Sequence, residues 1–227
     1  PTRRSSDLKW SDGEPVVAAD FEYAWKRALD PATAAGYAYQ MYYLLNGQKA
    51  NAGEVSVDEI GVKALDEKTL EVKLESPTPY FLQLTAFPCY FPVRKDIVEA
   101  DPEGWALNPE TYISNGPFTM TEWTHNDVLR LVKNENYYDA ENVKIEEIEY
   151  VMIVEGSTAF SAFQSGEIDY TENVPADQIV QLQEAQDANF NIFPYIGTYF
   201  YCFNMNADLM KDVKVREALS LAIDREA

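Results

Sequence analysis

Two hydrophobic periodicities follow one another along this chain, and together they restrict it to folds that mix helices with β-strands. Between residues 18 and 29, large apolar residues recur every four positions, which predicts a helix that Pro31 ends. Between residues 70 and 74, apolar and charged residues alternate, which predicts a strand with one solvent-exposed face. Because strand and helix patterns keep alternating after Ile145, we predict an α/β architecture.

The same periodicities predict the other elements of the fold. The remaining helices are expected over residues 34–45, 157–163 and 176–186, followed by a last helix that Asp212 caps. The remaining strands are expected over residues 62–65, 118–123, 128–132, 145–154, 190–195 and 198–204. Two hairpins result, one at residues 62–74 and one at residues 118–132. The continuous apolar run at the end of the 145–154 strand predicts burial on both faces.

The balance of charge excludes several classes of partner. The chain has 38 acidic against 18 basic side chains, and its formal net charge is -20. Nucleic acid and anionic membrane surfaces both attract clustered Lys and Arg, so we expect neither as a partner. The chain also lacks a run of about 18 apolar residues, the length that a membrane-spanning helix requires.

The residue types that carry most catalytic and metal chemistry are scarce. One His and two Cys exclude most zinc sites, iron–sulfur clusters and Ser–His–Asp or Cys–His triads. Paired carboxylates such as Glu146 and Glu147 lie in polar, turn-like stretches, where a solvated surface is a better interpretation than a glycosidase pair. We therefore predict a protein that binds rather than catalyses, with no catalytic residue, no metal site and no cofactor.

Three residue types have both a structural and a functional interpretation. Cys89 and Cys202 are interpreted as two buried free thiols, with a disulfide as the alternative. His125 is interpreted as an exposed residue of a hairpin turn. Aromatic residues make up 13% of the chain, and Tyr combines a flat apolar ring with a polar hydroxyl. This surplus suits a surface that holds ligands, although most single rings are expected to pack in the core.

Both ends of the sequence predict that it is a fragment. Residues 1–8 resemble one reading frame of a common sequencing adapter, so we interpret them as an artefact or a disordered tail. The last residues, from Ala222 onward, stop within an unfinished helical pattern. We predict poor stability for residues 9–227 alone, because missing segments would leave apolar faces bare.

Five stretches of the chain resemble, in order and spacing, the motifs of one known family. They are residues 9–31 (beginning KWSDGEPV), 114–118 (SNGPF), 165–169 (SGEID), 197–204 (GTYFYCFN) and 215–225 (VREALSLAIDR). The chain is similar in these motifs to the extracellular solute-binding proteins of family 5, the oligopeptide- and dipeptide-binding components of ABC importers.

The resemblance implies a class II periplasmic-binding-protein-like fold, of which this chain covers most of the first lobe and the start of the second. Residues 9–93 would form a small extra domain, residues 94–196 the first lobe, and residues 197–227 the start of a truncated second lobe. The two lobes of such proteins close over the ligand about a hinge.

The resemblance also implies which residues contact a bound peptide. Tyr37 stands where similar oligopeptide binders have a Tyr in the cleft, and Glu172 and Asn173 occupy the place of further contacts. Tyr195 and Phe200 flank the crossing into the second lobe, where relatives carry ligand-facing aromatic residues. Phe200 replaces a Tyr of some relatives and lacks its hydroxyl. Packing within the fold remains the alternative role for each of the five.

By resemblance, the function is that of an extracytoplasmic substrate-binding component, in the periplasm or on the outer face of the cell membrane. The full-length protein would be a lipid-anchored monomer that captures small peptides and delivers them to an ABC permease and ATPase. Four alternatives stay open: a nickel chelate, haem or oligosaccharide as the ligand, a secreted carboxylate-pair hydrolase, a surface adhesin, or a signalling receptor.

Overall fold

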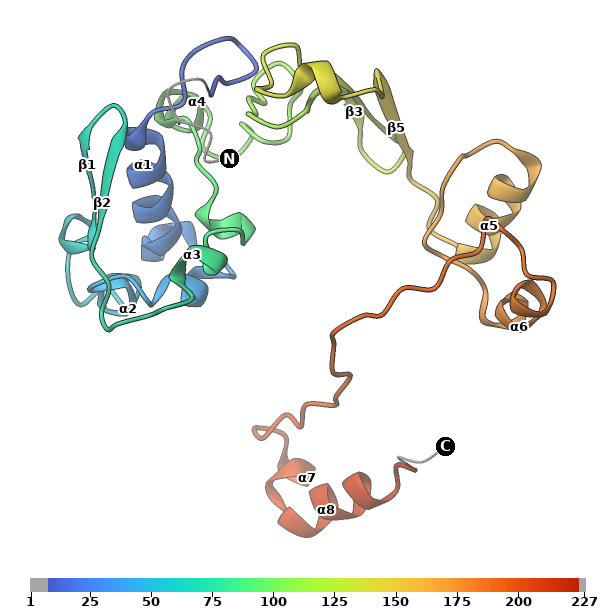
Figure 1. Cartoon of the computed structure of the whole chain (residues 1–227). Helices are drawn as coiled ribbons and strands as arrows, with labels where there is room; N and C mark the ends of the chain where they lie inside the picture. The colour runs from blue at the N-terminus through green and yellow to red at the C-terminus, as the bar shows by residue number, and fades with distance from the viewer. Residues whose placement is uncertain (1–7, 225–227) are drawn as a thin grey trace. The chain divides into compact units, whose positions relative to one another are not determined.

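The computed structural model describes residues 8–224 and divides the chain into two compact units, Pro1–Ala159 and Phe160–Ala227 (Figure 1). Residues 1–7, most of the expected artefact or tail, lie outside the described residues. Leu8 is described, and its carbonyl oxygen accepts a hydrogen bond of 3.0 Å from the backbone N–H of Val16.

The first helix of the chain, α1 (Ala18–Leu29), has the predicted bounds. Its beginning is stabilised by the buried Asp20 carboxylate, which accepts hydrogen bonds from the backbone N–H of Val17 at 3.0 Å and from Trp10 Nε1 at 3.1 Å. An acidic side chain in the first turn satisfies N–H groups that have no partner within the helix. The buried face of α1 includes Trp25 and Leu29.

A two-stranded hairpin lies against α1, as Figure 1 shows. Strands β1 (Val62–Asp66) and β2 (Thr69–Val72) pair antiparallel with Val62 opposite Val72, which confirms the predicted hairpin. The remaining short elements of this part are helices. They are α2 (Gly47–Asn51), α3 (Phe81–Leu84), the 3-10 helices η4 (Val57–Glu59) and η5 (Pro88–Tyr90), and α4 (Lys95–Ala100).

Helix, hairpin and short helices enclose one apolar core. Its centre is an aromatic cluster in which Trp25 meets Tyr90 edge-on at 5.2 Å and Phe81 at 6.4 Å between ring centroids. Leu29 and Leu44 are fully buried in the same core. Edge-to-face ring pairs of this kind contribute specific geometry beyond the burial of apolar area.

The prediction of a helix over residues 34–45 is wrong. This region contains the short 3-10 helix η3 (Ala38–Met41) instead, and another 3-10 helix, η2 (Pro31–Thr33), lies directly before it. The Asp30 carboxylate caps η2 by accepting a hydrogen bond of 2.9 Å from Ala32 N–H, and Ala34 then adopts a left-handed conformation with φ of 50°. A left-handed residue ends a helix, so the aromatic pattern that follows cannot continue it.

A second sheet contains β3 (Phe118–Thr124), β4 (Val128–Lys133) and β5 (Glu147–Val151), all antiparallel in that order. The hairpin of β3 and β4 confirms the prediction, and Asn126 takes φ of 63° in its turn. The 3-10 helix η6 (Ala140–Asn142) lies between β4 and β5. The predicted burial of the 151–154 run is wrong, because β5 is an edge strand and Val154, beyond its end, is 91% exposed.

The second unit consists of helices joined by a long extended segment. Helix α5 (Gly156–Ser165) crosses the boundary between the units and ends at Gly166, whose φ of 78° suits glycine. The other helices are α6 (Ala176–Glu184), α7 (Asp208–Lys211) and α8 (Val213–Leu221). Asp212 caps α8 as predicted, through a hydrogen bond of 2.9 Å from Lys214 N–H.

The two strands predicted at residues 190–195 and 198–204 are not formed. Residues 190–204 contain no helix or strand. Within this segment, residues 191–203 make no backbone hydrogen bond to any described residue, and a strand exists only as part of a ladder. The β-forming composition of this segment is real, but the neighbouring strand that it needs is not among the described residues.

Candidate functional site

Tyr37, the first of the predicted ligand-contacting residues, lies directly before η3 in the first unit. Ala38 and Met41 of η3 point into the core and are buried, whereas the Tyr37 ring is 57% exposed. The ring meets Phe87 edge-on at 5.1 Å and lies 6.1 Å from the ring of Tyr39. We call Tyr37, Tyr39 and Phe87 the aromatic triad.

Two hydrogen bonds connect the segment that carries Tyr37 and Tyr39 to helix α1. Trp25 Nε1 of α1 donates to the carbonyl oxygen of Tyr90 at 2.8 Å, and the Tyr90 hydroxyl donates to the carbonyl oxygen of Gln40 at 2.8 Å. Burial raises the pKa of Tyr90 well above its ordinary value, so its hydroxyl stays protonated and able to donate. The segment that carries Tyr37 and Tyr39 is therefore tied to α1 through the core.

Glu172 and Asn173 lie next to each other in an exposed loop of the second unit, between α5 and α6. The Tyr170 hydroxyl donates to Glu172 Oε1 at 3.2 Å, and this hydrogen bond raises the pKa of Tyr170. The backbone N–H of Asn173 donates to Thr171 Oγ1 at 3.2 Å. No hydrogen bond within residues 8–224 involves the Asn173 side chain, whose amide is available to an incoming group.

Tyr195 and Phe200 lie in the extended segment of the second unit and are 93% and 69% exposed. From Asn191 to Phe203, the described chain makes no backbone hydrogen bond. Other apolar side chains of this segment are exposed as well. They are Ile192, Phe193, Ile196, Tyr199 and Tyr201. The segment thus presents unpaired N–H and C=O groups together with aromatic rings.

The five predicted residues do not form one cluster within either unit. Tyr37 belongs to the first unit, whereas the other four belong to the second. The structure brings Tyr37 together with Tyr39 and Phe87, two rings that sequence reasoning missed. The sequence offers one signal for these two rings, because Tyr39 and Phe87 each lie in a stretch without charged residues.

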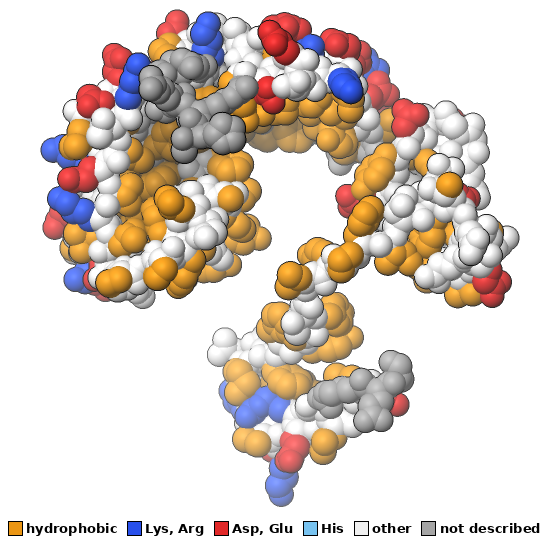
Figure 2. Space-filling view, viewed as in Figure 1, with side chains coloured by type: hydrophobic (Ala, Val, Ile, Leu, Met, Phe, Trp, Pro, Cys, Tyr) orange, Lys and Arg blue, Asp and Glu red, His pale blue; other side chains and the backbone are white. Residues whose placement is uncertain are grey.

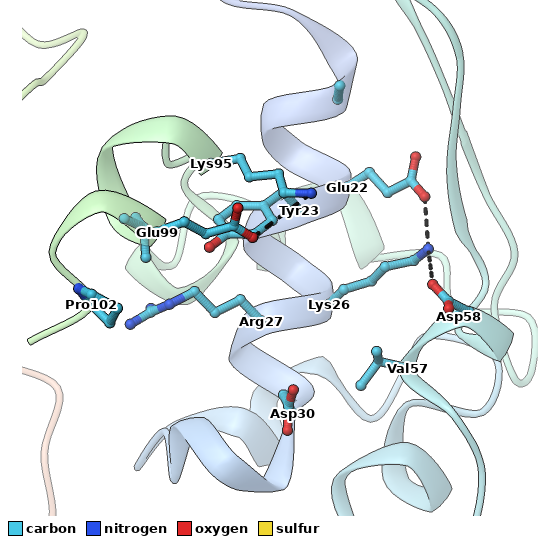
Figure 3. A pocket seen from close by; sticks show the side chains of 12 residues that line it. Glu22, Tyr23, Lys26, Arg27, Asp30, Val57, Asp58, Lys95, Glu99 and Pro102 are labelled. Carbon is cyan, nitrogen blue, oxygen red and sulfur yellow. Dashed lines mark hydrogen bonds and ion pairs between the residues drawn. The ribbon is translucent and has the colours of Figure 1, made fainter.

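A pocket of about 520 Å3 lies over α1 in the first unit, and none of the predicted site residues lines it (Figure 3). Lys26 lies between Glu22 at 2.8 Å and Asp58 at 3.1 Å. Burial opposes the ionisation of Glu22, but hydrogen bonds from Lys26 and from Ala64 N–H outweigh it and lower the Glu22 pKa. The spacing of Glu22 and Lys26 on one helix could have revealed this pair in the sequence.

The remaining charged groups of this pocket are also engaged. Lys95 pairs with Glu99 at 3.7 Å across one turn of α4, and the Arg27 guanidinium lies 5.9 Å from the centre of the Trp105 ring. Figure 3 shows Lys95 and Glu99 on one side of α1 and Asp58 on the other. The Lys26–Asp58 ion pair and the Arg27–Trp105 contact connect α1 to its neighbours, so the pocket is better explained by packing than by ligand binding.

Residues with catalytic or metal-binding potential are dispersed. His125 is exposed in the β3–β4 turn, as predicted, and its ring lies 4.3 Å from that of Trp123. Both cysteines are free thiols; Cys89 is half-buried, with its pKa raised by burial, but Cys202 is exposed, against the prediction that both are buried. Among residues 8–224, no group of three His, Cys, Asp or Glu side chains is placed to hold a metal ion. No helix in that range is long and apolar enough to cross a membrane.

Comparison with known proteins finds one family along almost the whole chain. The model of bacterial extracellular solute-binding proteins, family 5 (middle part), matches residues 6–227. An oligopeptide-binding protein of Bacillus subtilis (strain 168) is 42% identical over 225 residues, which are 97% of this chain and 41% of that protein. The chain therefore spans about 41% of the length of this relative.

The solved structures that match the fold include two OppA proteins. The OppA protein of Burkholderia pseudomallei has a TM-score of 0.92 and 38% identity, covering 99% of this chain and 44% of that one. The OppA protein of Haemophilus influenzae, in complex with the peptide RPPGFSPFR, has a TM-score of 0.90 and 30% identity, covering 97% of this chain and 43% of that one. These similarities confirm the expected fold class.

Proposed function

The chain belongs to the bacterial extracellular solute-binding proteins of family 5, and from this we propose that it is part of the peptide-capturing component of an ABC importer. The observation that carries the proposal is the 42% identity, over 97% of this chain, to a relative named as an oligopeptide-binding protein. The peptide held by the Haemophilus influenzae relative supports the same class of ligand.

The extended segment is suited to a peptide ligand. A bound peptide can be held as an added strand, through hydrogen bonds between main chains, while pockets or exposed rings take its side chains. Residues 191–203 offer unpaired backbone groups together with exposed aromatic rings. A protein that recognises main-chain groups in this way accepts peptides of many sequences.

We propose the ligand contacts and domains that the resemblance implies. Tyr37 contacts the peptide from the small extra domain of residues 9–93, and Glu172 and Asn173 contact it from the first lobe of residues 94–196. Tyr195 and Phe200 flank the crossing to the second lobe, which begins near residue 197. Closure of the lobes about a hinge would then exclude water from the peptide.

We propose that the whole protein acts outside the cytoplasm as a lipid-anchored monomer and passes its ligand to a permease and its ATPase. The family is one of extracellular solute-binding proteins, which supports this location. In this role the protein releases the peptide without altering it, and no catalytic residue is needed.

The test is calorimetry with the full-length protein, expressed from its complete reading frame and titrated with alanine peptides of two to six residues. We expect binding, and we expect Tyr37→Ala and Asn173→Ala each to weaken it about 5- to 30-fold, as loss of a ring contact or a hydrogen bond does. Unchanged affinity in both variants would assign these residues to packing. Thermal stabilisation by a nickel chelate, haem or an oligosaccharide, with no peptide binding, would replace the proposal with the alternative ligand.

A further inference from the structure

The three residues of the aromatic triad belong to two long stretches of sequence that contain no charged residue. Residues 31–48 and residues 76–93 contain no Asp, Glu, Lys or Arg, although charged residues make up 25% of the chain. The triad draws Tyr37 and Tyr39 from the first stretch and Phe87 from the second. Figure 2 shows hydrophobic side chains gathered over α3 and the segments beside it.

Two rings of the triad are exposed to solvent, and both carry a hydroxyl group. Tyr37 and Tyr39 are 57% and 52% exposed, and Phe87 packs partly against the core. The two Tyr rings are tilted by 39° with centroids 6.1 Å apart, and Phe87 meets Tyr37 at 66°. Neither Tyr hydroxyl donates a hydrogen bond to any of residues 8–224. An apolar group laid on these rings would therefore leave the two hydroxyls free for polar parts of the same ligand.

The triad is held in place before any ligand arrives. Ala38 and Met41, on either side of Tyr39, are buried, and the Tyr90 hydroxyl ties Gln40 to η5, which begins directly after Phe87. A preformed apolar surface costs little conformational entropy on binding.

We propose that the aromatic triad is a subsite for an aromatic side chain of the bound peptide, with Tyr39 and Phe87 as residues that determine this preference. The inference rests on the proposed function, since it names the class of peptide that the site favours. An aromatic side chain fits because ring pairs at 4.5–7 Å gain attraction beyond area burial. A cationic side chain fits less well, because no carboxylate stands in either stretch to complete its pairing.

The experiment compares tri-alanine and penta-alanine with peptides in which Phe, or Lys, replaces each Ala in turn, using calorimetry on the full-length protein. We expect Phe at one position to raise affinity about 3- to 10-fold over Ala. Tyr39→Ala should abolish that preference, so that the Phe peptide binds no more tightly than the alanine peptide of the same length. Tyr39→Phe keeps the ring and should retain the preference. Tyr80→Ala is the matched control, because Tyr80 is 50% exposed in the same uncharged stretch of sequence as Phe87 and its ring pairs with Tyr43 instead.

The possible results separate this inference from the function on which it rests. Peptide binding without any preference for Phe, or with a preference that persists in Tyr39→Ala, would overturn the subsite and leave the proposed function intact. A preference for Lys that Tyr39→Ala removes would also overturn it. Equal weakening of all peptides together with a lower melting temperature in Tyr39→Ala, but not in Tyr80→Ala, would show that the triad packs against the rest of the protein. Failure of every peptide to bind would refute both.

Discussion

Substitution of Tyr90 by Phe removes a single buried hydrogen bond from the core of the first unit. Tyr90 is 1% exposed, and its ring meets Trp25 at 5.2 Å and Phe81 at 6.0 Å. Phe keeps these ring contacts and loses only the hydroxyl, which donates to the carbonyl oxygen of Gln40 at 2.8 Å. The variant therefore tests whether this bond holds η3, and with it Tyr37 and Tyr39, to the core.

The expected loss in the free energy of unfolding is about 1–2 kcal/mol. A buried hydrogen bond contributes about 1 kcal/mol net, and a carbonyl oxygen left without its partner adds part of its desolvation penalty. Since a loss of 1 kcal/mol lowers the melting temperature of a domain of about 150 residues by about 2–4 °C, we expect a decrease of about 2–8 °C.

Urea unfolding followed by tryptophan fluorescence measures this loss selectively. All four tryptophans, Trp10, Trp25, Trp105 and Trp123, lie in the first unit, so their emission reports on that unit and not on the second. The control is Tyr112→Phe, which removes a hydroxyl that makes no hydrogen bond within residues 8–224. It should change stability by less than about 0.5 kcal/mol. An equally small change in Tyr90→Phe would refute the reasoning, because it would mean that the bond contributes nothing to stability.

Three further predictions address other parts of the first unit and the contrast with the second. Glu22 has its pKa lowered below the ordinary 4.5 by hydrogen bonds that outweigh burial, so its ionised form stabilises the fold above that pH and the stabilisation is lost as the pH falls through the lowered pKa. Glu22→Gln should flatten the acid limb of stability against pH in urea titrations, and an unchanged limb would contradict the assignment. Gly61→Ala should cost about 1–3 kcal/mol, because its Cβ would lie 2.8 Å from Leu45 Cβ, whereas Gly116→Ala, with nothing within 4 Å of the new Cβ, should be nearly neutral in the same assay. In hydrogen exchange on this chain alone, α1 amides should be protected and those of α6 and α8 should exchange rapidly, because neither of the last two helices has a buried residue. Equal protection in all three would contradict this.

Elements whose signals are local could be predicted from the sequence. The helix at 18–29 and the cap of α8 depend on neighbouring residues: an acidic residue in the first turn, Pro31 after the end, and Asp212 before the start. The two hairpins depend on short turns between alternating strands. In each case, the residues that determine the structure lie within a few positions of it, so no knowledge of distant packing was required.

Elements whose signals are tertiary could not be predicted. Residues 34–45 contain no Pro and many aromatic residues, yet Ala34 is left-handed and only residues 38–41 form a helix, the 3-10 helix η3, to which Tyr90 is hydrogen-bonded through Gln40. The contact between Phe87 and Tyr37 in the triad is also tertiary, since the two residues lie fifty positions apart in the sequence. The uncharged composition of both stretches is visible in the sequence, but their meeting is not.

The segment of residues 190–204 shows how a wrong structural prediction can carry functional information. Its content of β-branched and aromatic residues is typical of a strand, and strands are stable only when their backbone groups are paired. The described chain provides no such neighbour, so the residues that would face a sheet are instead exposed. A segment whose composition favours a strand, but whose backbone N–H and C=O groups have no partner, requires another stretch of polypeptide to pair with those groups. The proposed peptide ligand and the remainder of the protein are both polypeptide. We therefore expect Tyr195 and Phe200 to be ordered mainly through whichever of them pairs with the backbone between these two residues.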